Sequence, residues 1–543
     1  MTDMTDCLLI GFNDYDFSSY VNLVKSMGSD SGAYHDVRLA FVEHEGRYLR
    51  ALDLLTELHQ EWEGSKPGTY FHNADFLWPV IQVLGTYLHK RGLTFDYVNL
   101  FQQERERIRE KLASGKVRSV AITTTLYVSA APIIDIISFV RGISPDVKII
   151  VGGPYIANQA ATMDQGELSG LLEYLGADIY VIGSEGEIEL GDVVTLLREG
   201  TGTAALADVP NIAYLQNGLM RFTPEKVQTA ELQDNLVDYS LFQQEEIGQF
   251  VATRTAKSCP FSCAFCGFPQ RAGKYTYLGI EDVARELDHI QEIGSVTTLT
   301  FIDDTFNVPK NRFKKILELM IERQYTFKWN SFFRSDYGDE ETIHLMREAG
   351  CEAVFLGIES GSDTMLELMN KRSRRRHYLA ALNAFRDTGI SAYASFIVGF
   401  PGETAETVAQ TVELIEEGRP EYYRTQLWYC DPRTPVWDRR EELGIEGEAF
   451  TWRHNTMDWR TATGFITDIF TSVQNSTWMP QLGFEQWSTM YLQRRGMQRE
   501  EVRGYVQAFN EVVKDQLLNP EHTSIPPRLL APLQAASRFT PVA

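Results

Sequence analysis

The sequence lacks any long hydrophobic run. No segment of its 543 residues approaches the roughly 18 uninterrupted apolar residues that a membrane-spanning helix needs. The opening MTDMTDCLLIGF also lacks the basic start, the long apolar stretch and the small-residue cleavage site of a secretory signal. We therefore expect a cytoplasmic protein with no membrane partner.

Cysteine is scarce, with six residues in the whole chain. Three of them lie within the eight positions from 259 to 266, and the other three, Cys7, Cys351 and Cys430, stand alone. A disulfide framework would instead spread cysteine pairs along a small secreted domain. This distribution excludes a disulfide-stabilised protein and singles out the cluster for its chemistry.

Basic residues are few relative to acidic ones. The chain has 51 lysines and arginines against 74 aspartates and glutamates, a formal net charge of −23. A general nucleic-acid binder needs a basic face, so we expect no nucleic-acid partner. One local basic run, Lys371–Arg376 (KRSRRR), is interpreted as a solvated loop or helix start.

Apolar residues make up 43% of the chain and aromatic residues 12%, which is the composition of a globular protein with sizeable cores. The length accommodates two to four domains. From the order of expected elements we predict a lead-in over residues 1–70, an α/β domain over 71–205, a linker over 206–245, a second α/β domain over 246–440 and a mainly helical region over 441–543.

Short apolar strands alternate with helices in the first α/β domain. The strands are expected at 95–100, 119–124, 147–151 and 177–182. This alternation favours a doubly wound, Rossmann-like parallel sheet, whose ligand crevice lies beyond the carboxyl ends of the strands. Hydroxyl, glycine and turn residues gather at these ends: Thr123, Thr125, Gly152, Gly153, Pro154, Gly183, Glu185 and Gly186.

A second strand–helix series opens at Val251. Its later strands are expected at residues 298–302, 327–333, 353–357, 392–398 and 424–429, and helical stretches follow all but the last of these. About six β/α units in succession favour a partial or full (β/α)6 barrel. The fold class predicted for the whole chain is therefore α/β, with a doubly wound sheet, a barrel and a helical C-terminal region.

The clustered cysteines form a CxxxCxxC motif of Cys259, Cys263 and Cys266. Three thiolates on one loop can each bind a different iron of a [4Fe–4S] cubane, which leaves the fourth iron open to another ligand. The alternatives are a zinc site, which would need a fourth protein ligand, and three incidental buried cysteines. Phe265 suits an aromatic side chain beside a cluster, and Gly267 suits a tightly turning loop.

This motif resembles that of the radical S-adenosylmethionine (SAM) superfamily. In that family the open iron chelates the amino and carboxylate groups of SAM, which is then cleaved reductively to a 5′-deoxyadenosyl radical. Residues at successive strand ends resemble the family's SAM-binding positions: Asp303, Asp304, Arg334, Glu359, Ser360 and Gly399. The resemblance implies a [4Fe–4S] cluster, SAM and an external electron donor of the flavodoxin or ferredoxin type.

A doubly wound domain before such a barrel resembles the cobalamin-binding radical SAM enzymes. The resemblance implies cobalamin bound at the strand ends named above, with Tyr127 and Val128 nearest the lower face of the metal. The DxHxxG motif that supplies a histidine to cobalt in many cobalamin proteins is absent from this sequence. The alternative is a Rossmann-like domain that binds nothing and only packs on the barrel.

The two-domain order resembles methyltransferases that act on unactivated carbon or on phosphinate phosphorus of small-molecule or peptide natural-product intermediates. Gly11–Phe17 and Trp452–Met457 resemble the phosphinothricin-type P-methyltransferases. His454 is then a candidate acid or base facing the substrate, although a packing role is the alternative. Arg433 is a candidate catalytic residue that suits a carboxylate or phosphinate, with a structural ion pair as the alternative.

Two other functions remain open at this stage. The first keeps both cofactors but carries out ring contraction or cyclisation in place of methyl transfer. The second is a non-catalytic cobalamin or redox sensor, which the SAM-like strand ends disfavour. A methylthiotransferase is disfavoured because an upstream trio of extra cysteines is absent.

Overall fold

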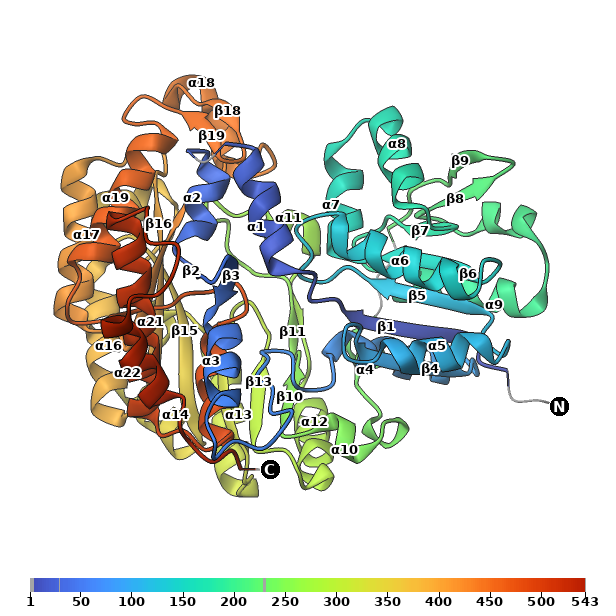
Figure 1. The fold of residues 1–543 in the computed structure, drawn as a ribbon, viewed down its shortest axis with the longest axis horizontal. Coiled ribbons are helices and arrows are strands. Elements are labelled where there is room, and N and C mark those ends of the chain that lie inside the picture. Colours follow the sequence, from blue (N-terminus) through green and yellow to red (C-terminus); the bar gives the residue numbers. More distant parts are fainter. Residues whose placement is uncertain (1–3, 29, 228–230, 543) are drawn as a thin grey trace. The chain divides into compact units, whose positions relative to one another are not determined.

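The computed structural model describes residues 4–28, 30–227 and 231–542 and divides into two compact units (Figure 1). Unit 1 comprises Met1–Asp16, Phe76–Val251 and Glu281–Val296, and unit 2 comprises Phe17–Asp75, Ala252–Ile280 and Thr297–Ala543. In these described ranges no helix is both long enough and apolar enough to cross a bilayer.

Unit 1 contains a seven-stranded sheet in the order β4-β1-β5-β6-β7-β8-β9. The first five strands are parallel, and β8 and β9 extend the sheet as an antiparallel hairpin. The strands are β1 (Cys7–Phe12), β4 (Phe95–Leu100), β5 (Ser119–Thr123), β6 (Lys148–Gly152), β7 (Ile179–Val181), β8 (Ile212–Gln216) and β9 (Leu219–Phe222). The main helices are α4 (Pro79–Lys90), α5 (Arg105–Ala113), α6 (Ala131–Ile143), α7 (Pro154–Thr162), α8 (Gln165–Leu175) and α9 (Glu187–Glu199).

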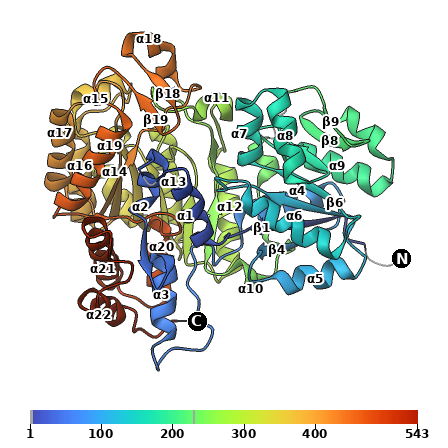
Figure 2. The same cartoon turned by 45° about the horizontal axis from the view of Figure 1, so that its top comes forward.

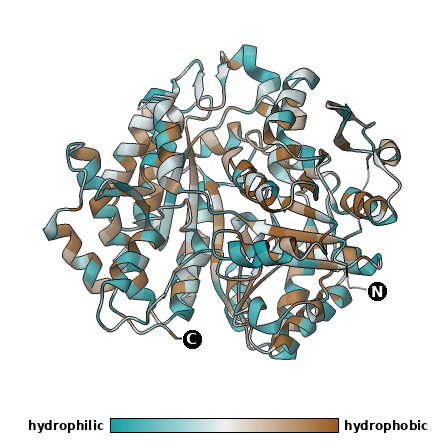
Figure 3. Cartoon of the chain, turned by 45° about the vertical axis from the view of Figure 1, so that its right-hand side comes forward, coloured by the Kyte–Doolittle hydropathy of each residue, from teal (hydrophilic) through white to brown (hydrophobic). Residues whose placement is uncertain are grey.

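The parallel strands of unit 1 are hydrophobic along most of their length, as Figure 3 shows. Leu8, Ile10, Val120, Ile122 and Val151 belong to one buried core cluster to which the flanking helices also contribute. Near-continuous apolar strands are typical of a parallel sheet covered on both faces. The doubly wound sheet predicted from the sequence is therefore confirmed.

The strand β1 is an interior strand of this sheet, between the edge strand β4 and β5. This differs from the predicted boundary, which assigned residues 1–70 to a separate lead-in. The chain builds β4 on one side of β1 and then β5, β6 and β7 on the other, so the order reverses between β1 and β5. Open α/β sheets bind ligands at such a switch point, beyond the carboxyl ends of the strands.

Unit 2 contains a second seven-stranded sheet in the order β10-β13-β14-β15-β16-β17-β20, parallel from β13 onward. Its strands are β10 (Phe250–Thr253), β13 (Thr298–Phe301), β14 (Lys328–Phe333), β15 (Cys351–Glu359), β16 (Ser391–Val398), β17 (Tyr422–Leu427) and β20 (Thr477–Trp478). Its helices include α13 (Lys310–Arg323), α14 (Glu340–Glu348), α15 (Asp363–Leu368), α16 (Arg375–Thr388) and α17 (Ala405–Gly418). The predicted barrel is thus confirmed as an open β/α series, with β20 as a seventh strand that we did not predict.

The C-terminal region of unit 2 is mainly helical, as predicted. It contains α19 (Trp459–Ser472), α20 (Gln486–Arg494), α21 (Arg499–Leu518) and α22 (Pro527–Ala536), besides the short hairpin β18 (Glu446–Glu448) and β19 (Thr451–Arg453). An early segment packs with these helices (Figure 2): α1 (Phe17–Ser26), α2 (Gly32–Arg38), β2 (Phe41–His44), β3 (Arg47–Arg50) and α3 (Ala51–Gln60).

Specific hydrogen bonds join the early segment to the last helices. Gln516 exchanges two bonds with the backbone of Glu43, at 2.9 and 2.6 Å. The Tyr505 hydroxyl donates to the Ala51 carbonyl at 2.6 Å. Bonds between segments so far apart in sequence fix residues 17–75 within unit 2.

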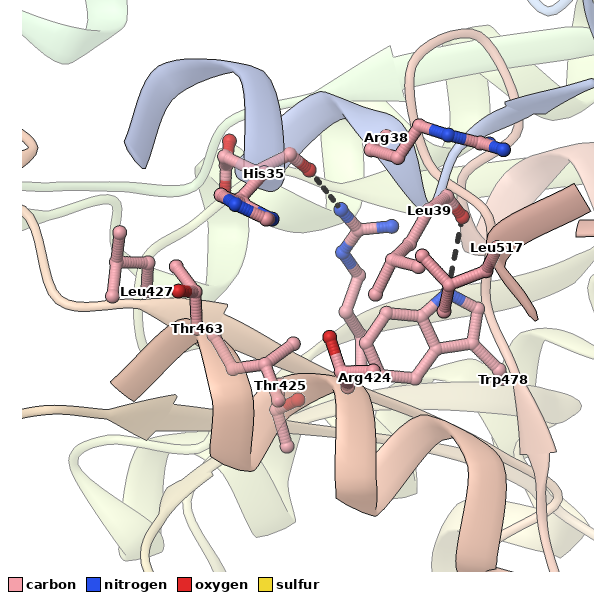
Figure 4. Close-up of a pocket in the computed structure, with 12 residues that line it drawn as sticks. His35, Arg38, Leu39, Arg424, Thr425, Leu427, Thr463, Trp478 and Leu517 are labelled. Carbon is pink, nitrogen blue, oxygen red and sulfur yellow. Dashed lines mark hydrogen bonds between the residues drawn. The ribbon is translucent and has the colours of Figure 1, made fainter. Parts of the chain in front are cut away.

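A buried arginine reinforces this junction (Figure 4). Arg424 is 3% exposed and donates to the backbone carbonyls of Met479, Pro480 and Asp36, the last at 3.0 Å. Its guanidinium stacks over the Trp478 ring at 5.1 Å. A cavity of about 10 Å³ beside it has room for one water-sized group, so the junction is nearly closed.

Replacing Arg424 by Met should lower the free energy of unfolding of unit 2 by about 3 kcal/mol, because two buried carbonyls and one partly buried carbonyl lose their donor. Denaturant titration followed by circular dichroism measures this change. Arg347→Met is the matched control, since Arg347 is an exposed arginine of the same unit. Equal stability of the two variants would contradict the structural role of Arg424.

Candidate functional site

The three clustered cysteines lie on a loop between the short strand β11 (Ala256–Lys257) and the helix α11 (Phe268–Ala272). All three thiols are free; Cys263 is buried, and the other two are partly buried. Burial raises the pKa of Cys259 and of Cys266, and the neighbouring Cys263 sulfur acts in the same direction. The three sulfurs are therefore close enough to interact electrostatically.

Three free thiols on one loop match the protein ligands of an iron–sulfur cubane that keeps one iron open. Among the residues that the structure describes, no three His, Cys, Asp or Glu side chains form a set that could hold one metal ion. Thiolates that each bind a different iron of a cubane do not have to converge on one point. Cys259, Cys263 and Cys266 would then hold three irons.

Backbone hydrogen bonds fix the cysteine loop from two neighbouring segments. The Ala264 N–H donates to the Met369 carbonyl at 2.8 Å, and the Val436 N–H donates to the Ala264 carbonyl at 2.9 Å. The Asn370 amide donates to the Ser262 carbonyl at 2.8 Å. The loop is thus held by the turn after α15 and by the segment that follows β17.

Arg334, predicted to bind a cofactor, lies against the cysteine loop. Its guanidinium is 3.7 Å from the centre of the Phe261 ring and forms a two-point ion pair with Asp336, with both distances 3.1 Å. It also donates to the Lys371 carbonyl at 2.6 Å. Because the side chain is only 7% exposed, Arg334 acts here mainly as a support of the loop.

Lys371 forms a buried ion pair with Glu359, at 2.8 Å. Burial acts to lower the pKa of Lys371, but the Glu359 carboxylate together with Tyr378 and Cys263 outweighs it and keeps that pKa above its ordinary value. The ammonium also lies 5.6 Å from the centre of the Phe265 ring. Interpreting the run from Lys371 to Arg376 as solvated is therefore wrong for Lys371, which sequence reasoning missed as a site residue.

The two aspartates at the end of β13 have different environments. Asp303 is fully buried and accepts bonds from the Thr255 amide at 2.6 Å, the Thr255 hydroxyl at 2.5 Å and the Ala256 amide at 2.8 Å. Asp303 therefore fixes the backbone that leads into the cysteine loop. Asp304 is exposed, yet desolvation by the surrounding protein raises the pKa of its carboxyl to about 6.

Ser360 and Gly399 lie at the ends of β15 and β16. Ser360 is fully buried, accepts the Ser362 N–H at 3.2 Å and lies 3.4 Å from the Thr411 hydroxyl. Gly399 has a φ of 94°, and a β-carbon there would lie 2.4 Å from the Trp452 ring. Glycine is therefore required at position 399, both for its backbone conformation and for this close approach.

His454 does not face a substrate in this structure. Its Nε2 lies 3.0 Å from the Gly399 carbonyl, and its Nδ1 accepts the N–H groups of Thr456 and Met457 at 3.3 and 3.4 Å. The ring stacks on Trp452, and burial lowers its pKa. The Thr456 hydroxyl also lies 3.1 Å from Nδ1. Both nitrogens thus have hydrogen-bond partners within the protein, which corrects the predicted acid–base role to a structural one.

Arg433 remains near the cysteine loop. Its guanidinium pairs with Asp431 at two points, both 2.9 Å. The backbone carbonyl of Arg433 lies 3.7 Å from where a β-carbon on Gly267 would stand. Its Nη1 is buried with no hydrogen-bond partner among the described residues, so one donor is available to a ligand.

In unit 1 the predicted glycines form a compact strand-end structure. Gly153 has a φ of 109°, and a β-carbon there would lie 2.9 Å from the Thr124 hydroxyl. Thr124 donates through both its N–H and its hydroxyl to the Gly152 carbonyl, each at 2.9 Å. Thr123 is buried at the end of β5, whereas Thr125 is partly exposed. Thr124, between these two predicted residues, therefore joins the ends of β5 and β6.

The loop after β5 carries two exposed apolar residues. Leu126 is 58% exposed with a φ of 67°, and Val128 is 74% exposed. Tyr127 points the other way: it is 8% exposed, and its hydroxyl accepts the Asn13 N–H at 2.7 Å. The prediction that Tyr127 lines a ligand face is thus corrected, and Leu126 is an exposed residue that sequence reasoning missed.

The remaining predicted residues of unit 1 lie at the next strand ends. Pro154 is the exposed first residue of α7. Gly183 follows β7, and Gly186 is the N-cap of α9, with the partly buried Glu185 between them. The ends of β5, β6 and β7 therefore lie side by side at one edge of the sheet, as predicted.

One buried acid at the end of β16 allows a test through pH. Glu403 is 1% exposed and accepts the Gly399 N–H, and burial raises its pKa from 4.5 to about 8. The folded protein therefore holds a proton that the unfolded chain releases above about pH 4.5. The stability contributed by this group is complete below pH 4.5 and is lost as the pH rises through about 8.

Glu403→Gln stays neutral at every pH, so its stability relative to the native chain should grow with pH between about 5 and 8, by at most about 1.4 kcal/mol per pH unit. Unfolding by urea at a series of pH values measures this difference. Glu406→Gln, at an exposed glutamate of α17, should show no such trend. A pH-independent difference for Glu403→Gln would contradict the raised pKa.

Comparison with known proteins connects this geometry to a family. The sequence profile of the radical SAM superfamily matches residues 254–415, which include the cysteine loop and the strand ends through Gly399. An uncharacterized methyltransferase of Pyrococcus horikoshii is 27% identical over 329 residues, covering 60% of this chain and 68% of the relative. The anaerobic magnesium-protoporphyrin IX monomethyl ester cyclase of Rubrivivax gelatinosus is 25% identical over 364 residues, covering 64% of this chain and 62% of the cyclase.

The fold of most of the chain has a solved counterpart. The radical SAM methyltransferase TsrM of Kitasatospora setae, determined with cobalamin and a [4Fe–4S] cluster bound, superposes with a TM-score of 0.59 at 16% identity. The match covers 85% of this chain and 97% of TsrM. At this identity the likeness concerns the fold, whereas the sequence match concerns the cysteine-bearing part: residues 254–415 match the radical SAM superfamily.

Proposed function

We propose that this protein is a cobalamin-dependent radical SAM methyltransferase. The observation that carries the proposal is the set of three free thiols on a braced loop at the start of the radical SAM domain. The same chain also contains a doubly wound sheet with a switch point. The relative described as a methyltransferase and the fold shared with TsrM support this reading.

The residues of unit 2 have distinct roles in this proposal. Cys259, Cys263 and Cys266 would hold a [4Fe–4S] cluster, with an external electron donor as its reductant. Since Asp303 is committed to backbone amides, Asp304 is the carboxylate left to accept the amino group of SAM. Glu359, held by Lys371, would bind the ribose.

The residues of unit 1 would bind cobalamin at the carboxyl ends of β5, β6 and β7. Because the glycine at position 153 has no side chain, a ligand can approach the backbone closely at these strand ends. Leu126 and Val128 offer an exposed apolar surface that suits the flat face of a corrin ring. When bound, the cluster with SAM would supply a deoxyadenosyl radical, and cobalamin would supply the methyl group.

For the substrate we propose a small-molecule or peptide intermediate with an anionic group, methylated at carbon or at phosphinate phosphorus. The unpaired Nη1 donor of Arg433 supports this class, because a guanidinium recognises carboxylate and phosphinate oxygens. The segment from Trp452 to Met457 packs internally through His454, so it adds no support for a phosphinate in particular.

A second candidate is cyclisation with the same cofactors, which is favoured by the likeness to the magnesium-protoporphyrin IX monomethyl ester cyclase. The mass of the product distinguishes the two. Methylation adds one methylene to the substrate in each turnover, whereas cyclisation leaves its heavy-atom count unchanged.

Replacing one of its thiol ligands tests the cluster. Cys263→Ala should reduce bound iron and abolish the formation of 5′-deoxyadenosine from SAM, because a cubane loses one of its three protein ligands. Anaerobic reconstitution, iron analysis and chromatography of the nucleoside measure both effects. Cys351→Ala, at a lone cysteine of β15, is the matched control and should retain both. Zinc in the anaerobically purified native protein would refute the cluster.

Charged substitutions in the loop after β5 test the cobalamin site. Leu126→Glu combined with Val128→Glu should weaken cobalamin binding by about tenfold or more, because charge replaces the apolar contact with the corrin. Equilibrium dialysis with hydroxocobalamin measures the dissociation constant. Leu219→Glu changes an equally exposed leucine of unit 1, on β9, and should have no effect. Unchanged affinity in the double variant would place cobalamin elsewhere.

A further inference from the structure

A cavity of about 570 Å³ lies in unit 2 at the amino ends of β16 and β17. Gly389 and Ile390 precede β16 there, and Pro420 and Glu421 precede β17. The radical SAM residues instead follow the carboxyl ends of the same strands. The cavity is therefore separate from the site described above, and its volume is that of a pocket for a small molecule.

The cavity is basic although the chain as a whole carries a net charge of −23. Its lining includes four arginines and two glutamates. Arg499 forms a multipoint ion pair with Glu421, with distances of 2.9 Å, 3.0 Å and 2.5 Å, and donates to the Gly389 carbonyl at 2.8 Å. This pair accounts for one positive and one negative charge.

The other three arginines have no carboxylate partner in the described part of the chain. Arg386 donates to the Gly418 carbonyl at 3.2 Å and to the Asn383 side chain at 2.6 Å, both neutral acceptors. Arg419 and Arg503 are exposed and form no ion pair within the described ranges. Glu500 is the one remaining acid of the lining, so positive charge is left uncompensated.

The polar wall of the cavity is rigidly held. The carboxylate of Glu416 accepts the N–H groups of Gln474 and Asn475 at 2.6 and 3.2 Å. The Ser476 hydroxyl donates to the Pro420 carbonyl at 2.6 Å, which fixes the same loop to the start of β17. A ligand would thus meet preorganised hydrogen-bonding groups and lose little free energy in ordering them.

We propose that this cavity binds a phosphate-bearing small molecule. Guanidinium groups present several N–H donors in a planar fork that matches the oxygens of a phosphate, and Arg386, Arg419 and Arg503 supply such forks without competing carboxylates. A phosphate also supplies the negative charge that these arginines lack. The site goes beyond the proposed methyl transfer and involves none of its residues.

Isothermal titration calorimetry of the full-length, anaerobically prepared protein with inorganic pyrophosphate tests the proposal. We expect saturable binding that weakens as ionic strength rises. The double variant R419Q and R503Q should raise the dissociation constant about tenfold or more. R347Q, at an exposed arginine of α14 outside the cavity, should leave it unchanged.

Three results would overturn the proposal: no saturable heat, equal affinity in the double variant, or citrate binding as tightly as pyrophosphate, since the last would indicate a general anion site. Thermal melting of each variant shows whether it is folded. The assay is independent of the proposed function, because formation of 5′-deoxyadenosine is measured separately and does not enter the titration.

Discussion

The cysteine loop depends on two buried cations, each held in place by a carboxylate. Arg334 stacks on Phe261 of the loop and pairs with Asp336, and Lys371 lies near Phe265 and pairs with Glu359. A buried charge is tolerated only with a well-placed partner, so movement of the loop would disturb both pairs. The same two cations favour the negative charge that three thiolates bring to the loop.

Much of this arrangement could be predicted because it is local in sequence. The CxxxCxxC spacing identifies the cysteine loop, and apolar runs that end in threonines (β5) or glycines (β6, β15 and β16) identify these strands with small errors at their ends. The order of the strands then implies that residues such as Asp304 and Gly399 lie at one edge of the sheet. These inferences need only periodicity and turn chemistry.

The rest could not be predicted, because it depends on partners distant in the chain. Asp303 and Asp304 are adjacent and chemically alike, yet only Asp303 meets the amides of Thr255 and Ala256, 48 and 47 residues away. The sequence suggests a catalytic role for His454, but in the structure its Nε2 lies within hydrogen-bond distance of the Gly399 carbonyl. Lys371 belongs to a basic run, and only the fold brings it to Glu359.

The position of β1 inside its sheet, between β4 and β5, could not be predicted for a similar reason. Its short apolar sequence does not indicate which later strands will flank it, and those strands begin at residues 95 and 119. Since residues 17–75 then join the other unit, no single boundary near residue 70 describes the start of the chain. Boundaries drawn from composition assume that each domain is one continuous stretch.

The segments of the two units alternate along the chain, and this affects how the protein folds during its synthesis. Glu43 and Ala51 find their hydrogen-bond partners 473 and 454 residues later, in α21, so the early segment leaves the ribosome long before it can pair. Unit 1 is complete only at Val296. Neither unit can therefore be excised as one uninterrupted fragment, and cuts near residues 70 or 245 leave each half without part of its own framework.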